Sequence, residues 1–182
     1  MLNRIESITK FLENKIPFSP KVGIILGTGL GGLVEKINIE QTIPYDEIPD
    51  FPVSTVEGHK GKLILGKLSG VNVIAMQGRF HFYEGYTIQE VTMPVRVMKN
   101  LGIKQLIISN ASGGVNPDYE VGDLMILNDH INLIPSPLVG PNLDVFGPRF
   151  PDMSDTYDKG MIETALSIGR SNGIRVFEGV YT

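Results

Sequence analysis

The chain has 182 residues, of which 42% are hydrophobic and 20% are charged, and this is the composition of a globular protein with a substantial core. Its net charge of −4 argues against a nucleic-acid-binding surface, and the lack of cysteine excludes disulfides, thiolate metal sites and a cysteine nucleophile. Charges interrupt the first 15 residues, which leaves no signal peptide or membrane span. We therefore expect a cytoplasmic protein with neither nucleic acid nor membrane as a partner.

Residues 1–53 alternate between helix-like and strand-like patterns. Apolar residues in segment 1–15 follow helical spacing and predict an amphipathic helix. The apolar run 22–26 predicts a strand covered on both faces, and it leads into the glycine-rich segment 27–32 and a short helix that ends near Ile37. Three prolines in segment 42–53 indicate irregular or edge structure.

The middle of the chain continues this alternation. Segments 63–68 and 71–76 are separated by Ser-Gly and predict a β-hairpin. Segment 88–101 has helical spacing and is followed by glycine, as a helix with a glycine cap would be. Segment 105–109 is predicted as a buried strand and segment 121–127 as a further strand.

The last third begins with a long loop, 134–151, which is rich in proline and glycine. A helix over 156–172 and a strand over 175–182 follow. Strands that alternate with helices and a hairpin predict an α/β fold, with a central mixed, largely parallel twisted sheet flanked by helices. We expect one domain over residues 1–182, incomplete at the C-terminus.

Glycines 27, 29 and 32 match the dinucleotide fingerprint GxGxxG directly after a strand. That fingerprint also requires a full helix, a second parallel strand and an acidic residue about 20 positions on, where this chain has the proline-interrupted segment 42–53. A simpler hypothesis is an anion site, in which backbone N–H groups and the Thr28 hydroxyl donate to an oxyanion. A plain tight turn is also open.

Segment 77–86 follows the second strand of the predicted hairpin. In an extended chain Arg79, His81 and Tyr83 project to one side, while Phe80 and Phe82 project to the other. Arginine and histidine can both donate to phosphate, and flanking aromatic rings exclude water. We therefore predict an anion-binding surface here rather than a solvated strand edge.

Three further features have a structural role as their default or alternative interpretation. His59 is a single loop histidine, for which a surface position is the default. His130 follows a predicted strand, and a local hydrogen bond is its default role. The second glycine turn, 110–114, could complete an anion site with its backbone N–H groups or serve only as a turn.

Taken together, these motifs resemble the trimeric purine nucleoside phosphorylases, in the wider family that includes the methylthioadenosine phosphorylases. The block Gly-Arg-Phe-His-Phe-Tyr-Glu-Gly-Tyr at 78–86 is the most specific of them. The resemblance covers nearly the whole chain. Its segments are 25–31, 56–61, 76–86, 110–114, 120–124, 129–132 and 149–155.

The resemblance implies a role for each matching residue. Arg79 and His81 correspond to catalytic residues that hold phosphate. Tyr83 would contact the ribose, and Phe150 would contribute to the nucleoside pocket of a neighbouring subunit. The phosphate-binding residues would be Thr28, Gly29, His59, Arg79, His81 and Ala111.

The resemblance further implies reversible phosphorolysis of purine nucleosides to free base and ribose 1-phosphate by a homotrimer. Inorganic phosphate is a co-substrate, and no metal or organic cofactor is needed. The family residues that contact the purine come after the point that corresponds to Thr182, so we expect a fragment with impaired activity. A noncatalytic phosphate-binding or assembly module and, less favoured, an NAD-dependent oxidoreductase are the alternatives.

Overall fold

The computed structural model describes residues 1–27, 29–53 and 61–182. The chain forms two compact units, Met1–Ser112 and Gly113–Thr182. Both units contain strands and helices, which confirms the α/β fold class. The prediction of one domain over the whole chain stays a prediction.

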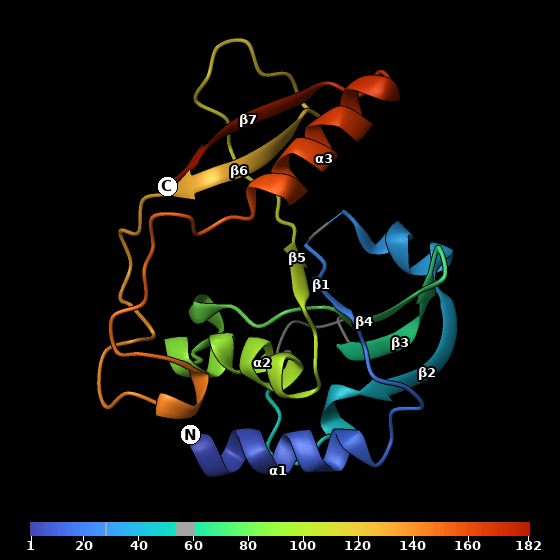
Figure 1. The fold of residues 1–182 in the computed structure, drawn as a ribbon, viewed down its shortest axis with the longest axis vertical. Helices are drawn as coiled ribbons and strands as arrows, with labels where there is room; N and C mark the ends of the chain where they lie inside the picture. Colours follow the sequence, from blue (N-terminus) through green and yellow to red (C-terminus); the bar gives the residue numbers. More distant parts are fainter. Residues whose placement is uncertain (28, 54–60) are drawn as a thin grey trace. The chain divides into compact units, whose positions relative to one another are not determined.

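The first unit is built on a five-stranded sheet with the strand order β2-β3-β4-β1-β5 (Figure 1). Strand β1 runs parallel to both of its neighbours, β4 and β5, whereas β3 runs antiparallel to β2 and β4. This arrangement confirms the predicted mixed sheet. The strands are β1 (Val22–Ile25), β2 (Asn38–Pro44), β3 (Lys62–Leu68), β4 (Val71–Gln77) and β5 (Gln105–Ile108).

The predicted hairpin is formed by β3 and β4. Leu68 pairs with Val71, so the connection has two residues, Ser69 and Gly70. Both have positive φ, 49° and 82°. Two left-handed residues match the right-handed twist of the flanking strands, and this explains why the Ser-Gly pair marks the turn.

One face of the sheet is covered by helices α1 (Leu2–Glu13) and α2 (Ile88–Asn100), which lie side by side in Figure 1. Gly23 of β1 leaves room for α2, because a Cβ at this position would lie 3.0 Å from the sulfur of Met98. Each helix has an apolar stripe at helical spacing, as predicted. The buried apolar residues of the two helices are Ile5, Ile8 and Leu12 in α1, and Met93, Pro94, Val97 and Met98 in α2.

The opposite face of the sheet packs against the short 3-10 helix Gly31–Lys36, which follows the first glycine-rich loop. The chain then enters β2, which lies at the edge of the sheet and pairs antiparallel with β3. A dinucleotide fold would instead continue with a full helix and a second parallel strand. The structure therefore argues against a dinucleotide-binding role for the GxGxxG pattern. The shared cluster on this face contains Ile24, Leu26, Val34, Ile37, Ile64, Val73 and Ala75.

Two strand predictions need correction. Segment 105–109 was expected to be buried, but β5 lies at the end of the sheet order, and Ile107 and Ile108 are 46% and 57% exposed. An apolar run favours a strand without showing what covers it. The strand expected over 121–127 is β6 (Leu124–His130). It begins later because Gly122 has a φ of 100°, which a regular strand does not accommodate.

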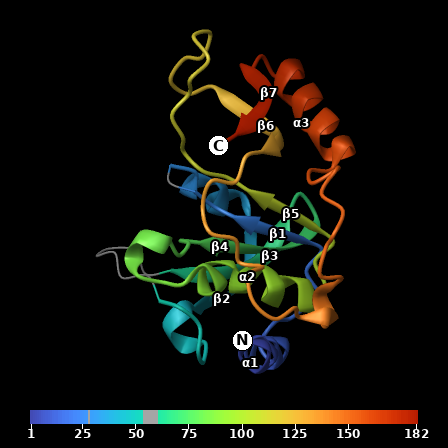
Figure 2. The same cartoon turned by 90° about the vertical axis from the view of Figure 1, so that its left-hand side faces the viewer.

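In the second unit β6 pairs in parallel with β7 (Val176–Tyr181), and helix α3 (Lys159–Ser171) packs against both strands, as Figure 2 also shows. A Cβ on Gly169 of α3 would lie 2.7 Å from Val176, so the absence of a side chain lets helix and strand approach closely. The helix and the last strand agree with prediction. Among the described residues, no helix is both long and apolar enough to cross a membrane.

Candidate active site

The strand register places the ends of three parallel strands at one level. Ile25 of β1 pairs with Met76 of β4 on one side and with Ile108 of β5 on the other. The three loops that follow these strands therefore start beside one another. The carboxyl ends of parallel strands are where ligands bind in open α/β sheets.

These three loops meet at Ser109. The backbone N–H of Gly27 donates to Ser109 Oγ at 3.1 Å, and Arg79 Nη1 donates to the Ser109 carbonyl oxygen at 3.1 Å. A Cβ on Gly27 would lie 2.4 Å from that carbonyl oxygen. The first glycine of the GxGxxG pattern is thus required by the close approach of two loops.

Arg79, His81 and Glu84 form a chain of polar contacts. Arg79 Nε donates to His81 Nε2 at 3.1 Å, and His81 Nδ1 lies 2.7 Å from Glu84 Oε1. Because arginine has no acceptor, Nε2 of His81 must accept, and the ring proton then lies on Nδ1 and is donated to Glu84. The side chains of His81 and Glu84 are 27% and 2% exposed, so a buried carboxylate orients a half-exposed imidazole.

The prediction of an extended segment with alternating sides is wrong after His81. Phe80 is buried at 3% exposure, but Phe82 is 59% exposed. The chain turns into the 3-10 helix Phe82–Glu84, because Glu84 accepts the backbone N–H of His81 and Gly85 ends the turn with a φ of 93°. Tyr83 nevertheless lies beside His81, with the two rings stacked 4.7 Å apart.

Of the remaining predicted site residues, three are described by the structure and two are not. Gly29 is exposed with a φ of 86°, and Ala111 is exposed in the loop after β5. Phe150 lies in the second unit, is 88% exposed and has the Arg149 guanidinium 5.9 Å from its ring centroid. Thr28 and His59 lie outside the described residues. The roles of all these residues stay predictions.

His130 agrees with its structural interpretation. Its ring Nδ1 lies 3.3 Å from the hydroxyl of Tyr157, and its backbone N–H bonds to Asp129. These are local contacts within the second unit.

Arg79 also borders a cavity of about 190 Å³ between the strand ends and α2. Among the described residues that line it, Arg79 is the charged one and Thr92 adds a hydroxyl, while the others are apolar. An arginine beside apolar side chains interacts with an anion more strongly than one surrounded by water, because the local dielectric is lower.

Two residues of this site were missed in the sequence. Glu84 stands three positions after His81, which is the spacing of a capping box and could have identified it. Ser109 follows the apolar run of β5, so the sequence already indicated that it lies at a strand end. Its contacts with the two other loops depend on strand order, which the sequence pattern does not contain.

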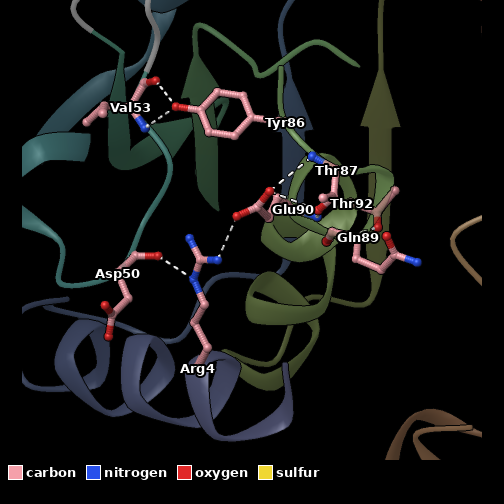
Figure 3. A network of polar contacts seen from close by, with 8 residues as sticks. All are labelled: Arg4, Asp50, Val53, Tyr86, Thr87, Gln89, Glu90 and Thr92. Atoms are coloured by element: carbon pink, nitrogen blue, oxygen red, sulfur yellow. Dashed lines mark hydrogen bonds and ion pairs between the residues drawn. The ribbon is translucent and has the colours of Figure 1, made fainter. Parts of the chain in front are cut away.

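Residues 78–87, which carry Arg79, His81 and Tyr83 between β4 and α2, are called the Arg-His-Tyr loop. A polar network holds the C-terminal end of this loop (Figure 3). The Tyr86 hydroxyl accepts the N–H of Val53 at 3.1 Å and donates to the carbonyl oxygen of the same residue. Glu90 caps α2 by accepting the N–H of Thr87 at 3.0 Å, and it pairs with Arg4 of α1 at 3.0 Å. The Thr87 N–H foremost, and then Arg4, lower the pKa of the Glu90 carboxyl.

Comparison with known proteins identifies the family of this chain. The model of the phosphorylase superfamily matches residues 21–182. The whole chain aligns at 55% identity with purine nucleoside phosphorylase 1 of Bacillus subtilis and spans 68% of that protein. Purine nucleoside phosphorylase of Schistosoma mansoni in complex with inosine superposes with a TM-score of 0.93 at 43% identity, over 98% of this chain and 65% of that one.

A crystal structure of purine nucleoside phosphorylase in complex with ribose-1-phosphate has a TM-score of 0.94 at 45% identity, over 99% of this chain and 68% of that one. The chain thus spans about two thirds of the length of these proteins. Identity at this level over the whole chain, with the same fold, settles the family. The chain belongs to the phosphorylase superfamily and, within it, to the purine nucleoside phosphorylases.

Proposed function

We propose that this chain serves reversible phosphorolysis, in which a purine nucleoside and inorganic phosphate give the free purine and ribose 1-phosphate. The proposal rests on the family and on one structural observation: Arg79, His81 and Ser109 meet where three parallel strands end. The named relatives include one in complex with inosine and one in complex with ribose-1-phosphate. An oxidoreductase is not favoured, because these relatives are phosphorylases.

The proposed task of the strand-end residues is to hold the phosphate. The Arg79 guanidinium is a planar donor suited to a phosphate oxygen, and His81 lies against it. The exposed backbone of Gly29 and Ala111 can supply N–H donors. Thr28 and His59, which the structure does not describe, are proposed to complete the phosphate contacts.

In the proposed reaction the bond between ribose C1′ and the purine nitrogen breaks, and its electron pair leaves with the purine. C1′ becomes cationic, as in glycoside hydrolysis, and a phosphate oxygen then forms the new bond to C1′. A phosphate fixed beside C1′ both stabilises the positive charge and is placed for attack. The reaction requires no metal and no organic cofactor.

Two aromatic residues are assigned to the nucleoside. Tyr83 is 77% exposed and stacked on His81, so its ring can contact a ribose bound beside the phosphate. Phe150 is 88% exposed and is proposed to enter the site of a neighbouring subunit in a homotrimer. A large exposed aromatic ring is a common anchor of protein interfaces. The cytoplasm is the proposed location.

The direct test incubates the chain with inosine and phosphate and measures hypoxanthine and ribose 1-phosphate by chromatography. Arg79→Ala should weaken the phosphate dependence about 10- to 100-fold, as expected for the loss of a charge-assisted hydrogen bond. Arg170→Ala, which removes an exposed arginine from α3, is the matched control.

An unchanged phosphate dependence in Arg79→Ala would contradict the proposed site. Phosphate binding that depends on Arg79 without any turnover of inosine would favour the noncatalytic module. The expectation of impaired activity in the 182-residue chain stays a prediction, and the same assay measures it.

A further inference from the structure

The residues that precede and follow Arg79 are both held by one buried aromatic residue, Tyr45. Its hydroxyl donates to the carbonyl oxygen of Gly78 at 2.7 Å, and its ring lies 5.2 Å from that of Phe80. Tyr45 is 1% exposed, and burial raises the pKa of its phenol, so the hydroxyl stays a donor at neutral pH. Arg79 therefore sits between a tethered carbonyl and a packed ring.

Tyr45 itself is fixed from several sides. Its backbone N–H donates to the Gly61 carbonyl oxygen at 3.0 Å, and a Cβ on Gly61 would lie 2.2 Å from its ring. Phe51 packs on it at 5.1 Å and also contacts Phe80 at 5.6 Å. A ring with so many close neighbours has one position available, and its hydroxyl is a rigid anchor.

The backbone at Gly78 needs such an anchor. Its φ is 95°, in the left-handed region, where glycine has several accessible conformations of similar energy. A small rotation at this residue would swing the Arg79 side chain away from His81 and from the Ser109 carbonyl. The hydrogen bond from Tyr45 selects one of these conformations.

We propose that Tyr45 is a positioning residue for Arg79, and that its hydroxyl sets the direction from which the guanidinium meets phosphate. This role rests on the proposed function. Tyr45 acts through the backbone of Gly78 and through Phe80. Tyr45 belongs to the segment after β2, and no sequence pattern connects this segment with the site.

The test compares the phosphate affinity of variants by ³¹P NMR titration with inorganic phosphate, which also detects weak binding. Tyr45→Phe keeps the ring and removes only the hydroxyl, and it should weaken phosphate binding about tenfold, because the guanidinium is no longer held in place. Tyr86→Phe is the matched control. It removes another hydroxyl that bonds to backbone, at Val53, and should change the affinity less than about twofold.

A second comparison separates positioning from general loosening of the fold. In an Arg79→Ala background, Tyr45→Phe should cause no further loss of affinity, because its effect passes through Arg79. Phe80→Leu, on the other side of Arg79, gives an independent variant should Tyr45→Phe be partly unfolded by circular dichroism. It too should weaken binding only when Arg79 is present.

The outcomes are distinguishable. Equal losses from Tyr45→Phe with and without Arg79, or equal effects of Tyr45→Phe and Tyr86→Phe, overturn the positioning role and leave the proposed function standing. Failure of the unmodified chain to bind phosphate overturns both.

Discussion

The tautomer of His81 is set by its two neighbours at the site. Arg79 donates to Nε2, so the ring proton is on Nδ1 and faces the buried carboxylate of Glu84. A phosphate that displaces this Arg79 contact meets an imidazole whose orientation Glu84 already fixes. Such preorganisation lowers the entropy that the site loses when the ligand binds.

We expect Glu84→Ala to weaken phosphate binding about tenfold, because His81 loses the partner that orients its ring. Glu84→Gln keeps an acceptor for the Nδ1 proton and should lie between Glu84→Ala and the unmodified chain. Titration of all three proteins with phosphate by calorimetry measures this order. Equal affinities in the three proteins would show that Glu84 does not orient His81.

At the residue scale the sequence was informative where a side chain's role follows from its place after a strand. Arg79 and His81 could be singled out this way, and the structure brings them into contact. The side to which Phe82 projects was predicted wrongly, because an alternation of period two assumes an extended chain. The Glu84 carboxylate ends the extended conformation by accepting the backbone N–H of His81. Tyr45 could not have been linked to Gly78, because 33 residues separate them and only folding brings them together.

At the scale of elements, α2 is fixed at its start by a capping box. Thr87 Oγ1 accepts the N–H of Glu90, and Glu90 accepts the N–H of Thr87 in return. Arg4 joins the same carboxylate to α1. The junction between the Arg-His-Tyr loop and α2 is therefore one of the more firmly tied points of the first unit.

Glu90→Gln should lower the free energy of unfolding by about 1 kcal/mol at neutral pH, the typical size of a lost cap. The folded state lowers the pKa of Glu90, so the contribution of its carboxylate is present above the ordinary value of 4.5 and is lost as the pH falls through the folded-state pKa. Urea unfolding at several pH values should thus show a difference that shrinks in acid. Glu6→Gln, at an exposed position of α1, is the control. A difference independent of pH would contradict the role of the charge.

Among the elements, β1, β3 and β4 were predictable because apolar runs between turn residues specify them locally. The start of β6 was misjudged because Val121 extends the apolar pattern across Gly122, whose positive φ breaks the strand. The exposure of β5 could not be predicted, because its place at the end of the sheet is a property of topology.

At the scale of the whole molecule, the described chain presents an apolar strand at the end of its main sheet. Ile107 and Ile108 of β5 are 46% and 57% exposed. Exposed edge strands with apolar side chains favour association between chains. The exposed apolar side chains of β5 are therefore a physical reason to expect this chain to associate.

Ile107→Lys should reduce concentration-dependent association, because a charge on an edge strand opposes pairing with another chain. Light scattering over a concentration series measures the effect. Val115→Lys, at a 99% exposed apolar residue outside the strands, should have little influence. Identical scattering of all three proteins would contradict this account.

A crystal structure of the chain grown with inorganic phosphate would test the central claim most directly. The account predicts one phosphate at the ends of β1, β4 and β5, with the Arg79 guanidinium donating to its oxygens and the His81 ring beside it. A phosphate bound elsewhere, with Arg79 still donating to His81 and to the Ser109 carbonyl, would contradict it.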